Sequence, residues 1–145
     1  MSAEPVPRIS LSPISVSDGE EIIELFNYYV ENSDAAFPEN PVPVGFFEQI
    51  RSLLPHYPTV TAKDTDGIVI GFGMLRPYNP MPGFRQTAVI SYFIHPRYTR
   101  MGIGSQMLLF LEDNAKENGI ISILAEISSR NTGSIRFHEK NGFIH

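Results

Sequence analysis

The sequence contains no cysteine among its 145 residues. Without a thiol, the chain can form no disulfide, no thiolate metal site and no cysteine-linked acyl intermediate, which is typical of the reducing cytoplasm. Long apolar runs are absent too, since none approaches the ~20 residues that cross a membrane. The segment 1–8 also lacks the apolar region of a signal peptide. We therefore expect a cytoplasmic protein without membrane contact.

Positive charge is scarce as well. The 11 lysines and arginines stand against 16 aspartates and glutamates, which gives a net charge of −5. Because a nucleic-acid site needs a basic surface, no nucleic-acid partner is expected. His56, His95 and His145 are scattered along the sequence, so no metal site is predicted.

The composition is that of one globular domain. Hydrophobic residues make up 42% of the chain and charged residues 19%, and 145 residues are enough for one core. No internal repeat is visible, so we predict a single domain over residues 1–145. The 12 prolines gather between the predicted elements, which favours ordered but irregular connections.

Hydrophobic periodicity predicts an α/β (α+β) chain with the order β-α-α-β-β-β-α-β-α-(β). The expected strands are 8–12, 59–63, 68–75, 86–94 and 120–128, and the expected helices are 18–31, 46–54, 102–118 and 131–140. Ser17 and Glu20 have the spacing of a capping box at the first helix. Phe143 is predicted to begin a further strand.

The segment 90–105 has the clearest chemical meaning. A β-rich apolar run leads into a short turn with Gly102 and Gly104, and a long amphipathic helix follows. Successive backbone N–H groups at a helix N-terminus attract an anion such as phosphate, and Arg100 adds positive charge. We therefore predict a phosphate site here, with a plain tight turn as the alternative.

Three phosphate ligands suit such a turn. A nucleotide bound by a P-loop is improbable, because no Gly-Lys-Ser/Thr follows the glycines. A dinucleotide is disfavoured, because Met107 stands at the third glycine of the fingerprint and Ile123 lies where an acidic residue is needed. The third ligand is the pyrophosphate of coenzyme A.

Two segments carry a resemblance to the GNAT superfamily of N-acetyltransferases. The segment 99–104 is similar to [QR]-x-x-G-x-[GA], with Thr99 at the first position, and 131–143 is similar to N-x-x-[AS]-x-x-[FL]-[YH]-x-x-x-G-[FY]. The resemblance covers essentially the whole chain. It implies a mixed, mostly antiparallel sheet with helices on both faces. It also implies an N-acetyltransferase that uses acetyl-CoA as cosubstrate.

Within the superfamily, the chain most resembles the phosphinothricin and methionine sulfoximine acetyltransferase group. The resemblance rests on the segments Asn-Tyr-Tyr-Val-Glu-Asn at 27–32, Phe-Arg-Gln-Thr at 84–87 and His-Glu-Lys at 138–140. It implies that the acceptor is the primary amine of a small molecule, such as an amino acid or an analogue. The group carries Glu where this chain has Val89, so the carboxylate expected as general base is missing.

The resemblance assigns the acetyl-CoA contacts mainly to the backbone. The pyrophosphate is expected on the amides of Arg100, Met101, Gly102, Ile103, Gly104 and Ser105. The strand residues Tyr92, Phe93 and Ile94 are expected to offer main-chain groups to the pantetheine arm and one N–H to the thioester carbonyl. Asn131 is expected to contact the pantetheine, or else to be the N-cap of the last helix.

The catalytic predictions concern His138 and Glu126. His138 replaces the tyrosine with which many members protonate the leaving thiolate, a task that imidazole can perform near neutral pH, unless it only packs there. Glu126 is the best substitute for the missing base, or else part of an ion pair at the sheet surface. Arg76 and Arg85 are expected to hold an acceptor carboxylate, or else to be solvated.

Two hypotheses stay open at this point. The first is an enzyme; the second is a coenzyme A-binding module with weak or no catalysis, which Val89 permits. A GNAT fold normally ends with a β-hairpin after the last helix, and only 142–145 follow here. Either a truncated chain or a partner chain that supplies the strands, as in a homodimer, is expected to account for this.

Overall fold

The computed structural model describes residues 8–32, 40–52, 56–99, 101–127 and 130–144. Its strands are β1 (Ser10–Ser12), β2 (Thr59–Lys63), β3 (Val69–Pro77), β4 (Thr87–Ile94) and β5 (Ser122–Ala125). Its helices are α1 (Gly19–Asn32), α2 (Phe47–Arg51), α3 (Ile103–Glu117) and α4 (Thr132–Lys140). Short 3-10 turns lie at η1 (Val16–Asp18), η2 (Val44–Phe46), η3 (Pro82–Phe84) and η4 (Pro96–Tyr98).

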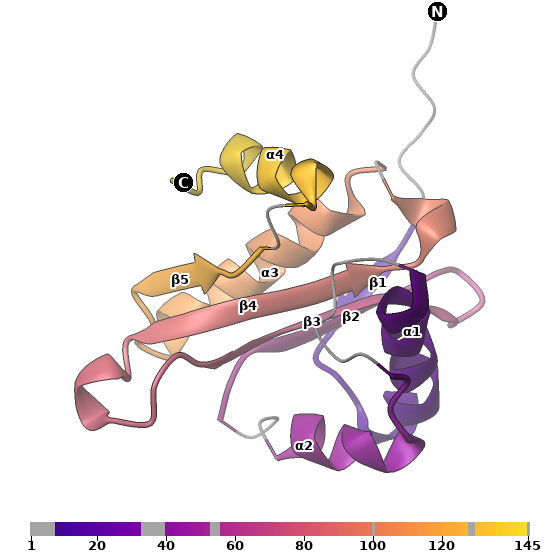
Figure 1. Ribbon diagram of the computed structural model, residues 1–145, viewed down its shortest axis with the longest axis horizontal. Coiled ribbons are helices and arrows are strands. Elements are labelled where there is room, and N and C mark those ends of the chain that lie inside the picture. The colour runs from indigo at the N-terminus through magenta and orange to yellow at the C-terminus, as the bar shows by residue number, and fades with distance from the viewer. Residues whose placement is uncertain (1–7, 33–39, 53–55, 100, 128–129, 145) are drawn as a thin grey trace, which may run out of the picture.

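The five strands form one sheet in sequence order, β1-β2-β3-β4-β5 (Figure 1). The first three pairings are antiparallel, and β4 pairs with β5 in parallel. The parallel pairing is possible because the α3 crossover returns the chain to the end of the sheet at which β4 began. The predicted mixed, mostly antiparallel sheet is therefore confirmed.

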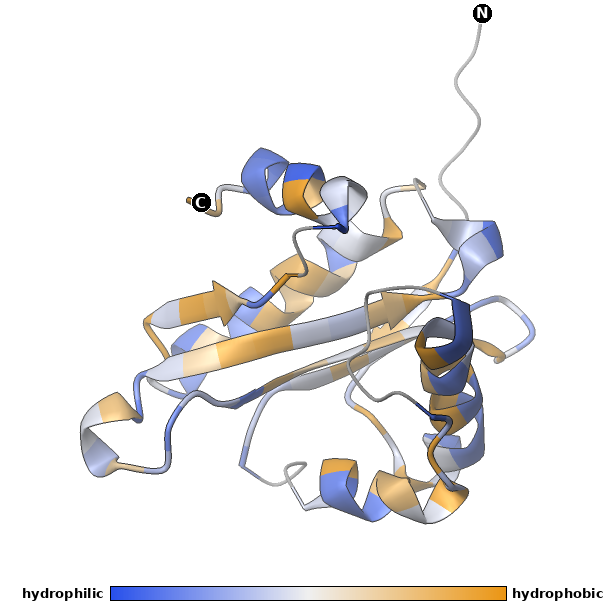
Figure 2. Ribbon diagram, in the orientation of Figure 1, coloured by the Kyte–Doolittle hydropathy of each residue, from blue (hydrophilic) through white to orange (hydrophobic). Residues whose placement is uncertain are grey.

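Helices cover both faces of the sheet, as predicted. Figure 1 shows α1 and α2 on one side and α3 and α4 on the other. On the first side Ile22 and Phe47 pack with Phe72 of β3, and on the second side Met107 and Leu111 of α3 belong to a separate core. Figure 2 shows an apolar stretch in the middle of β4 and a more polar one before the strand ends. The sheet therefore separates two cores, and β4 changes character along its length.

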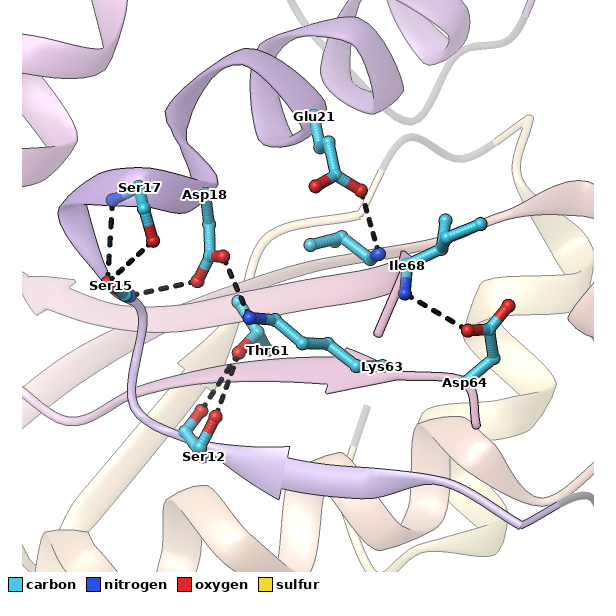
Figure 3. Close-up of polar contacts among 10 residues, drawn as sticks. Ser12, Ser15, Ser17, Asp18, Glu21, Thr61, Lys63, Asp64 and Ile68 are labelled. Carbon is cyan, nitrogen blue, oxygen red and sulfur yellow. Dashed lines mark hydrogen bonds and ion pairs between the residues drawn. The ribbon is translucent and has the colours of Figure 1, made fainter. Parts of the chain in front are cut away.

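The start of α1 differs from the prediction. Ser15, and not Ser17, is the N-cap, and it caps η1, which leads directly into α1: its hydroxyl accepts from the Ser17 N–H, and the Asp18 carboxylate accepts from the Ser15 N–H at 3.0 Å (Figure 3). The sequence holds two overlapping pairs with the same spacing, Ser15 with Asp18 and Ser17 with Glu20. Asp18 is the residue used because it is buried and its other oxygen lies 2.9 Å from Lys63 Nζ on β2. This contact anchors α1 to the sheet.

β5 is shorter and more exposed than the predicted strand 120–128. It covers Ser122–Ala125 only, and Leu124 and Ile121 are exposed hydrophobic residues at and beside it. Among the described residues, β5 is an edge strand whose one neighbour is β4. An apolar run looks the same in a sequence whether the strand is central or at an edge, so the prediction of a buried strand is wrong.

Two further predicted elements change. The described residues form no strand at Phe143, whose N–H donates to the carbonyl of His138 at 3.0 Å instead. The second predicted helix, 46–54, becomes a 3-10 turn followed by α2, which ends at Arg51. The predicted end of that helix, 53–54, lies outside the described residues.

Candidate functional site

β4 and β5 separate halfway along β4. Their parallel register reaches Ile90 and, within the described residues, goes no further, whereas β3 stays paired with β4 as far as Ile94. Beyond Ile90, the backbone groups of β4 that point toward β5 therefore have no strand partner in the described part of the chain. Such groups can bind the amides of an extended ligand as a further strand would. The main-chain contacts predicted for Tyr92 and Phe93 fall at this opening.

The end of β4 is tied to α1. The hydroxyl of Tyr29 donates a hydrogen bond to the carbonyl of Ile94. The Phe93 ring lies 5.4 Å from the rings of Tyr29, Phe26 and Phe72. These contacts hold the last residues of β4 against β3 and α1 while β5 departs. The carbonyl of Ile94, one of the predicted pantetheine contacts, is engaged by the protein itself.

The turn after β4 brings the N-terminus of α3 close to the end of that strand. Gly102 is the N-cap of α3 with φ +83°, a left-handed conformation that glycine adopts without strain. A Cβ on Gly104 would lie 3.1 Å from Cδ1 of Ile94 and 3.1 Å from Cζ of Phe137. The first turn of α3 therefore packs closely against β4 and α4 at Gly104, where a larger residue would not fit. Its N–H groups, which no side chain of the described residues caps, suit an anion.

The other residues of the predicted phosphate turn differ in exposure. Ile103 is fully buried in the core under α3, so only its N–H can reach a ligand. Met101 is exposed, and Ser105 is half-buried. Arg100 lies outside the described residues, and its charge contribution stays a prediction. Asn131 is the N-cap of α4, because its Oδ1 accepts from the Ser134 N–H at 3.2 Å.

His138 on α4 has both ring nitrogens engaged. Nδ1 lies 2.7 Å from the carbonyl oxygen of Ser134, which can only accept, so Nδ1 carries the proton. Nε2 therefore accepts from the hydroxyl of Tyr92, 2.6 Å away on β4. The His138 side chain is buried, with the rings of Phe137 and Phe143 edge-on to it. The pair joins β4 to α4 on the α3 side of the sheet.

Both members of this pair are held in their neutral forms. Burial lowers the pKa of His138, and the hydrogen bond to the Ser134 carbonyl offsets only part of that effect. Burial also raises the pKa of Tyr92 above its ordinary value. The resting site therefore contains an imidazole and a phenol, not an imidazolium and a phenolate.

The lowered pKa of His138 makes stability depend on pH. An unfolded histidine takes up a proton near pH 6.5, more readily than folded His138, so the contribution of His138 is complete above that pH and is lost as the pH falls toward its folded pKa. We expect the melting temperature of the wild type to decline below about pH 6.5 more steeply than that of His138→Gln. The exposed His56 provides the control His56→Gln, which should follow the wild type. Parallel curves for wild type and His138→Gln would contradict the assignment.

Three polar side chains form a cluster on the opposite face of the sheet: Arg76, Ser91 and Glu126. Arg76 is the register partner of Val89 on β4. Its Nε lies 3.4 Å from Ser91 Oγ, and its guanidinium lies 3.8 Å from a carboxylate oxygen of Glu126. The Arg76 and Glu126 side chains are 39% and 56% exposed, so ligands can reach both. The structure brings these two predicted residues together as an ion pair at the sheet surface.

Arg85 and Val89 are not part of this cluster. Arg85 is exposed at the end of η3, and no hydrogen bond or ion pair joins its guanidinium to another described residue. Its contact with an acceptor stays a prediction. Val89 is buried and lies beside Leu124 in the β4–β5 register, so its side chain serves packing.

Sequence reasoning missed two side chains at the opening. Tyr92 is predicted only as a main-chain contact, and Ser91 is not predicted at all. The alternation of a strand could have placed them on opposite faces. Their partners, His138 and Arg76, lie 46 and 15 residues away in the chain, and no local pattern reports such pairings.

A groove of about 1160 Å³ lies between α3, β5 and α4, with His138 and Glu126 among its lining residues. In the described part of the chain, no three His, Asp or Glu residues stand close enough to hold a metal ion. Nor does any described helix combine the length and the apolar character that a membrane crossing requires.

Comparison with known proteins places the chain among acetyltransferases. Residues 22–143 match the model of the Acetyltransferase (GNAT) family. The chain is 26% identical to a phosphinothricin N-acetyltransferase of Streptomyces viridochromogenes, over 99% of this chain and 78% of the relative. It is 30% identical to an L-methionine sulfoximine/L-methionine sulfone acetyltransferase of Pseudomonas paraeruginosa, over 92% and 79%. A phosphinothricin acetyltransferase of Sinorhizobium meliloti, solved with acetyl-CoA, superposes with a TM-score of 0.88 at 25% identity, over 94% and 75%.

Proposed function

Since the chain belongs to the acetyltransferase (GNAT) family, we propose that it acetylates the primary amine of a small amino acid or an amino-acid analogue. It is an N-acetyltransferase with acetyl-CoA as cosubstrate, as its family and its relatives indicate. The class of acceptor is the proposed part. The observation that supports it is the exposed Arg76–Glu126 pair, which stands beside the β4–β5 opening.

An amino acid carries a carboxylate and an ammonium group on neighbouring atoms. The Arg76–Glu126 pair presents the two complementary charges side by side. The planar guanidinium of Arg76 can hold a carboxylate through two parallel hydrogen bonds, and Glu126 attracts the ammonium group. Because both side chains are more than a third exposed, their ion pair contributes little to stability. Its charges are available to an acceptor.

The two faces of the opening divide the chemistry. On the Arg76 face, Glu126 or a water that it orients accepts a proton from the ammonium, which leaves a neutral amine able to attack. In the opening, a free N–H of β4 donates to the thioester oxygen as negative charge develops there. At the end of the opening, the first-turn amides of α3 offer partial positive charge to a pyrophosphate. The glycines Gly102 and Gly104 leave room for it.

The hypothesis of a coenzyme A-binding module without catalysis has lost its main support. It rested on Val89, where a carboxylate was expected. In the β4–β5 register Val89 lies beside Leu124, and Glu126 follows Leu124 by two residues, just after β5 ends. The Glu126 carboxylate pairs with Arg76, which is the register partner of Val89, and we propose that it replaces the carboxylate that β4 lacks.

Thiol release tests the proposal. The protein is mixed with acetyl-CoA and one of three matched acceptors: free amino acids, the same amino acids with amidated carboxyl groups, and simple alkylamines. We expect release of free coenzyme A with some of the free amino acids and little with the amidated forms, which cannot bind Arg76 as carboxylates. Equal rates with free and amidated forms would overturn the acceptor class. No release with any amine would overturn the activity.

Asn131 offers a separate prediction, because capping and ligand binding can be distinguished there. Asn131→Ala removes the α4 cap and is expected to cost about 1 kcal/mol in urea unfolding. Asn131→Ser keeps a capping oxygen and should unfold as the wild type does. If Asn131 also binds the pantetheine arm, Asn131→Ser will weaken acetyl-CoA binding in calorimetry despite its normal stability. Unchanged binding would leave the cap as its whole role.

A further inference from the structure

We propose that the Tyr92 hydroxyl protonates the leaving thiolate of coenzyme A, and that His138 is the positioning residue behind it. The inference rests on the proposed function. It changes the role predicted from the sequence, in which His138 meets the thiolate itself. The supporting observation is the chain of hydrogen bonds from the Ser134 carbonyl through His138 to Tyr92.

His138 has no ring nitrogen left for a ligand. Nδ1 donates to the Ser134 carbonyl at 2.7 Å, and Nε2 faces the Tyr92 hydroxyl at 2.6 Å. The side chain is 6% exposed. A proton can therefore pass between Nε2 and the opening only through the oxygen of Tyr92.

Tyr92 stands at the opening itself. It follows Ile90, the last residue that pairs with β5, by two positions, and its hydroxyl reaches α4. Its ring therefore spans from β4 to α4. The backbone beneath it is closely fitted, because a Cβ on Gly73, its partner on β3, would lie 2.8 Å from Tyr92 Cβ. Tyr92 is thus held from β3 and from α4 at once.

Protonation of His138 reverses the hydrogen bond of the pair. In the resting state the Tyr92 O–H donates to Nε2. When Nε2 carries a proton, it donates to the Tyr92 oxygen, and the phenolic O–H is released to point into the opening. The pair therefore becomes a donor toward the ligand only when His138 is an imidazolium.

The proton balance is as follows for one turnover. The C–S bond of the thioester breaks and its electron pair goes to sulfur; the Tyr92 O–H bond breaks, and its proton forms the S–H bond. The Tyr92 oxygen takes the Nε2 proton, and His138 later regains one from solvent through the same oxygen. The acceptor ammonium loses two protons on the other face, one before and one after attack. One proton is released in total.

The charged groups around the pair come from three elements. Glu112 and Lys116 of α3, Glu126 beyond β5 and Glu139 of α4 line the groove that His138 also borders. The Glu126 carboxylate lies on the other face of the sheet, where it pairs with Arg76. Burial favours the neutral ring, so the donor state forms only when His138 takes up a proton.

The experiment compares Tyr92→Phe, His138→Gln and the double variant with the wild type in the thiol-release assay. We expect each single variant to lower kcat about tenfold with little change in KM for acetyl-CoA, which is less than is usual for a general acid because a thiolate leaves readily. The double variant should be no slower than either, since the two act as a unit. The wild-type kcat should fall as the pH rises through the pKa of His138, which burial lowers from its ordinary value, and that fall should be absent from Tyr92→Phe. Tyr57→Phe, which is partly buried against the same core, is the matched control and should be unchanged.

A second readout does not depend on the acceptor. The ¹⁵N resonances of His138 should report a proton on Nδ1, and saturation with coenzyme A alone should shift Nε2 in the wild type but not in Tyr92→Phe. If the wild type shows this shift yet acetylates no amine, the proposed function fails and the pairing stands. A proton on Nε2 at neutral pH, no shift with coenzyme A, or a wild-type kcat in either single variant would overturn the inference.

Discussion

A Gly104→Val variant is expected to bind acetyl-CoA about 100-fold more weakly than the wild type, a loss of about 2.8 kcal/mol. Even the first carbon of the new side chain would lie 3.1 Å from both Ile94 and Phe137. The two methyl groups of valine come closer still, so the first turn of α3 must move away from β4 and α4. The amides that hold the pyrophosphate move with it. Overpacking of this kind also costs about 1–3 kcal/mol of unfolding free energy.

Gly133→Val is the matched control for this prediction. Gly133 also lies in the first turn of a helix, α4, but a Cβ there would have no neighbour within 4 Å. Calorimetric titration with acetyl-CoA should therefore separate the two variants, and urea unfolding should show whether Gly104→Val is folded. If folded Gly104→Val binds acetyl-CoA within about threefold of the wild type, the close approach at Gly104 does not position the phosphate site.

The sheet was predictable because local and global signals agree along most of its strands. Strand 59–63 matches β2 residue for residue. It is a β-rich run bounded by Pro58 and by the turn 64–67, and four of its five residues are buried. The same reasoning fails at β5, where the apolar residues Ile121 and Leu124 are exposed. The number of neighbours a strand will have is a property of the whole fold.

The capping error at α1 has a different origin. Ser15 with Asp18 and Ser17 with Glu20 are equivalent as local patterns. Lys63 decides between them. It lies on β2, 45 residues after Asp18, and forms an ion pair with the Asp18 carboxylate. A capping signal therefore predicts that a helix begins nearby, and tertiary contacts decide at which residue.

The candidate site was predictable in its backbone and not in its side-chain pairs. The glycine turn and the segment at 131–143 are local, and they indicated the family correctly. The contacts Tyr92–His138 and Arg76–Glu126 join residues that are far apart in sequence. Both pairs cross the place where β4 and β5 separate. The two contacts depend on the separation of β4 from β5, and the sequence of one strand does not predict that separation.

A Glu126→Gln variant is expected to lower kcat/KM about 100-fold near pH 7, the lower end of the range for loss of a general base. Glutamine keeps the shape of the side chain and can still accept a hydrogen bond from Arg76, but it cannot take a proton. The loss should shrink as the pH approaches the pKa of the acceptor's ammonium group, because the amine then loses its first proton without help. This pH dependence is the signature of a base.

The same substitution at Glu139 supplies the control. Glu139 is an exposed carboxylate that lines the same groove, and Glu139→Gln should keep the wild-type rate at every pH. A deficit in Glu126→Gln that stays constant from neutral to alkaline pH, and that lies in KM for the acceptor alone, would assign Glu126 to binding the ammonium group. The amine would then have to reach the opening already neutral, and the enzyme would need its highest activity well above neutral pH. The two pH profiles therefore decide whether Glu126, just after the end of β5, acts as a general base or only binds the ammonium group by its charge.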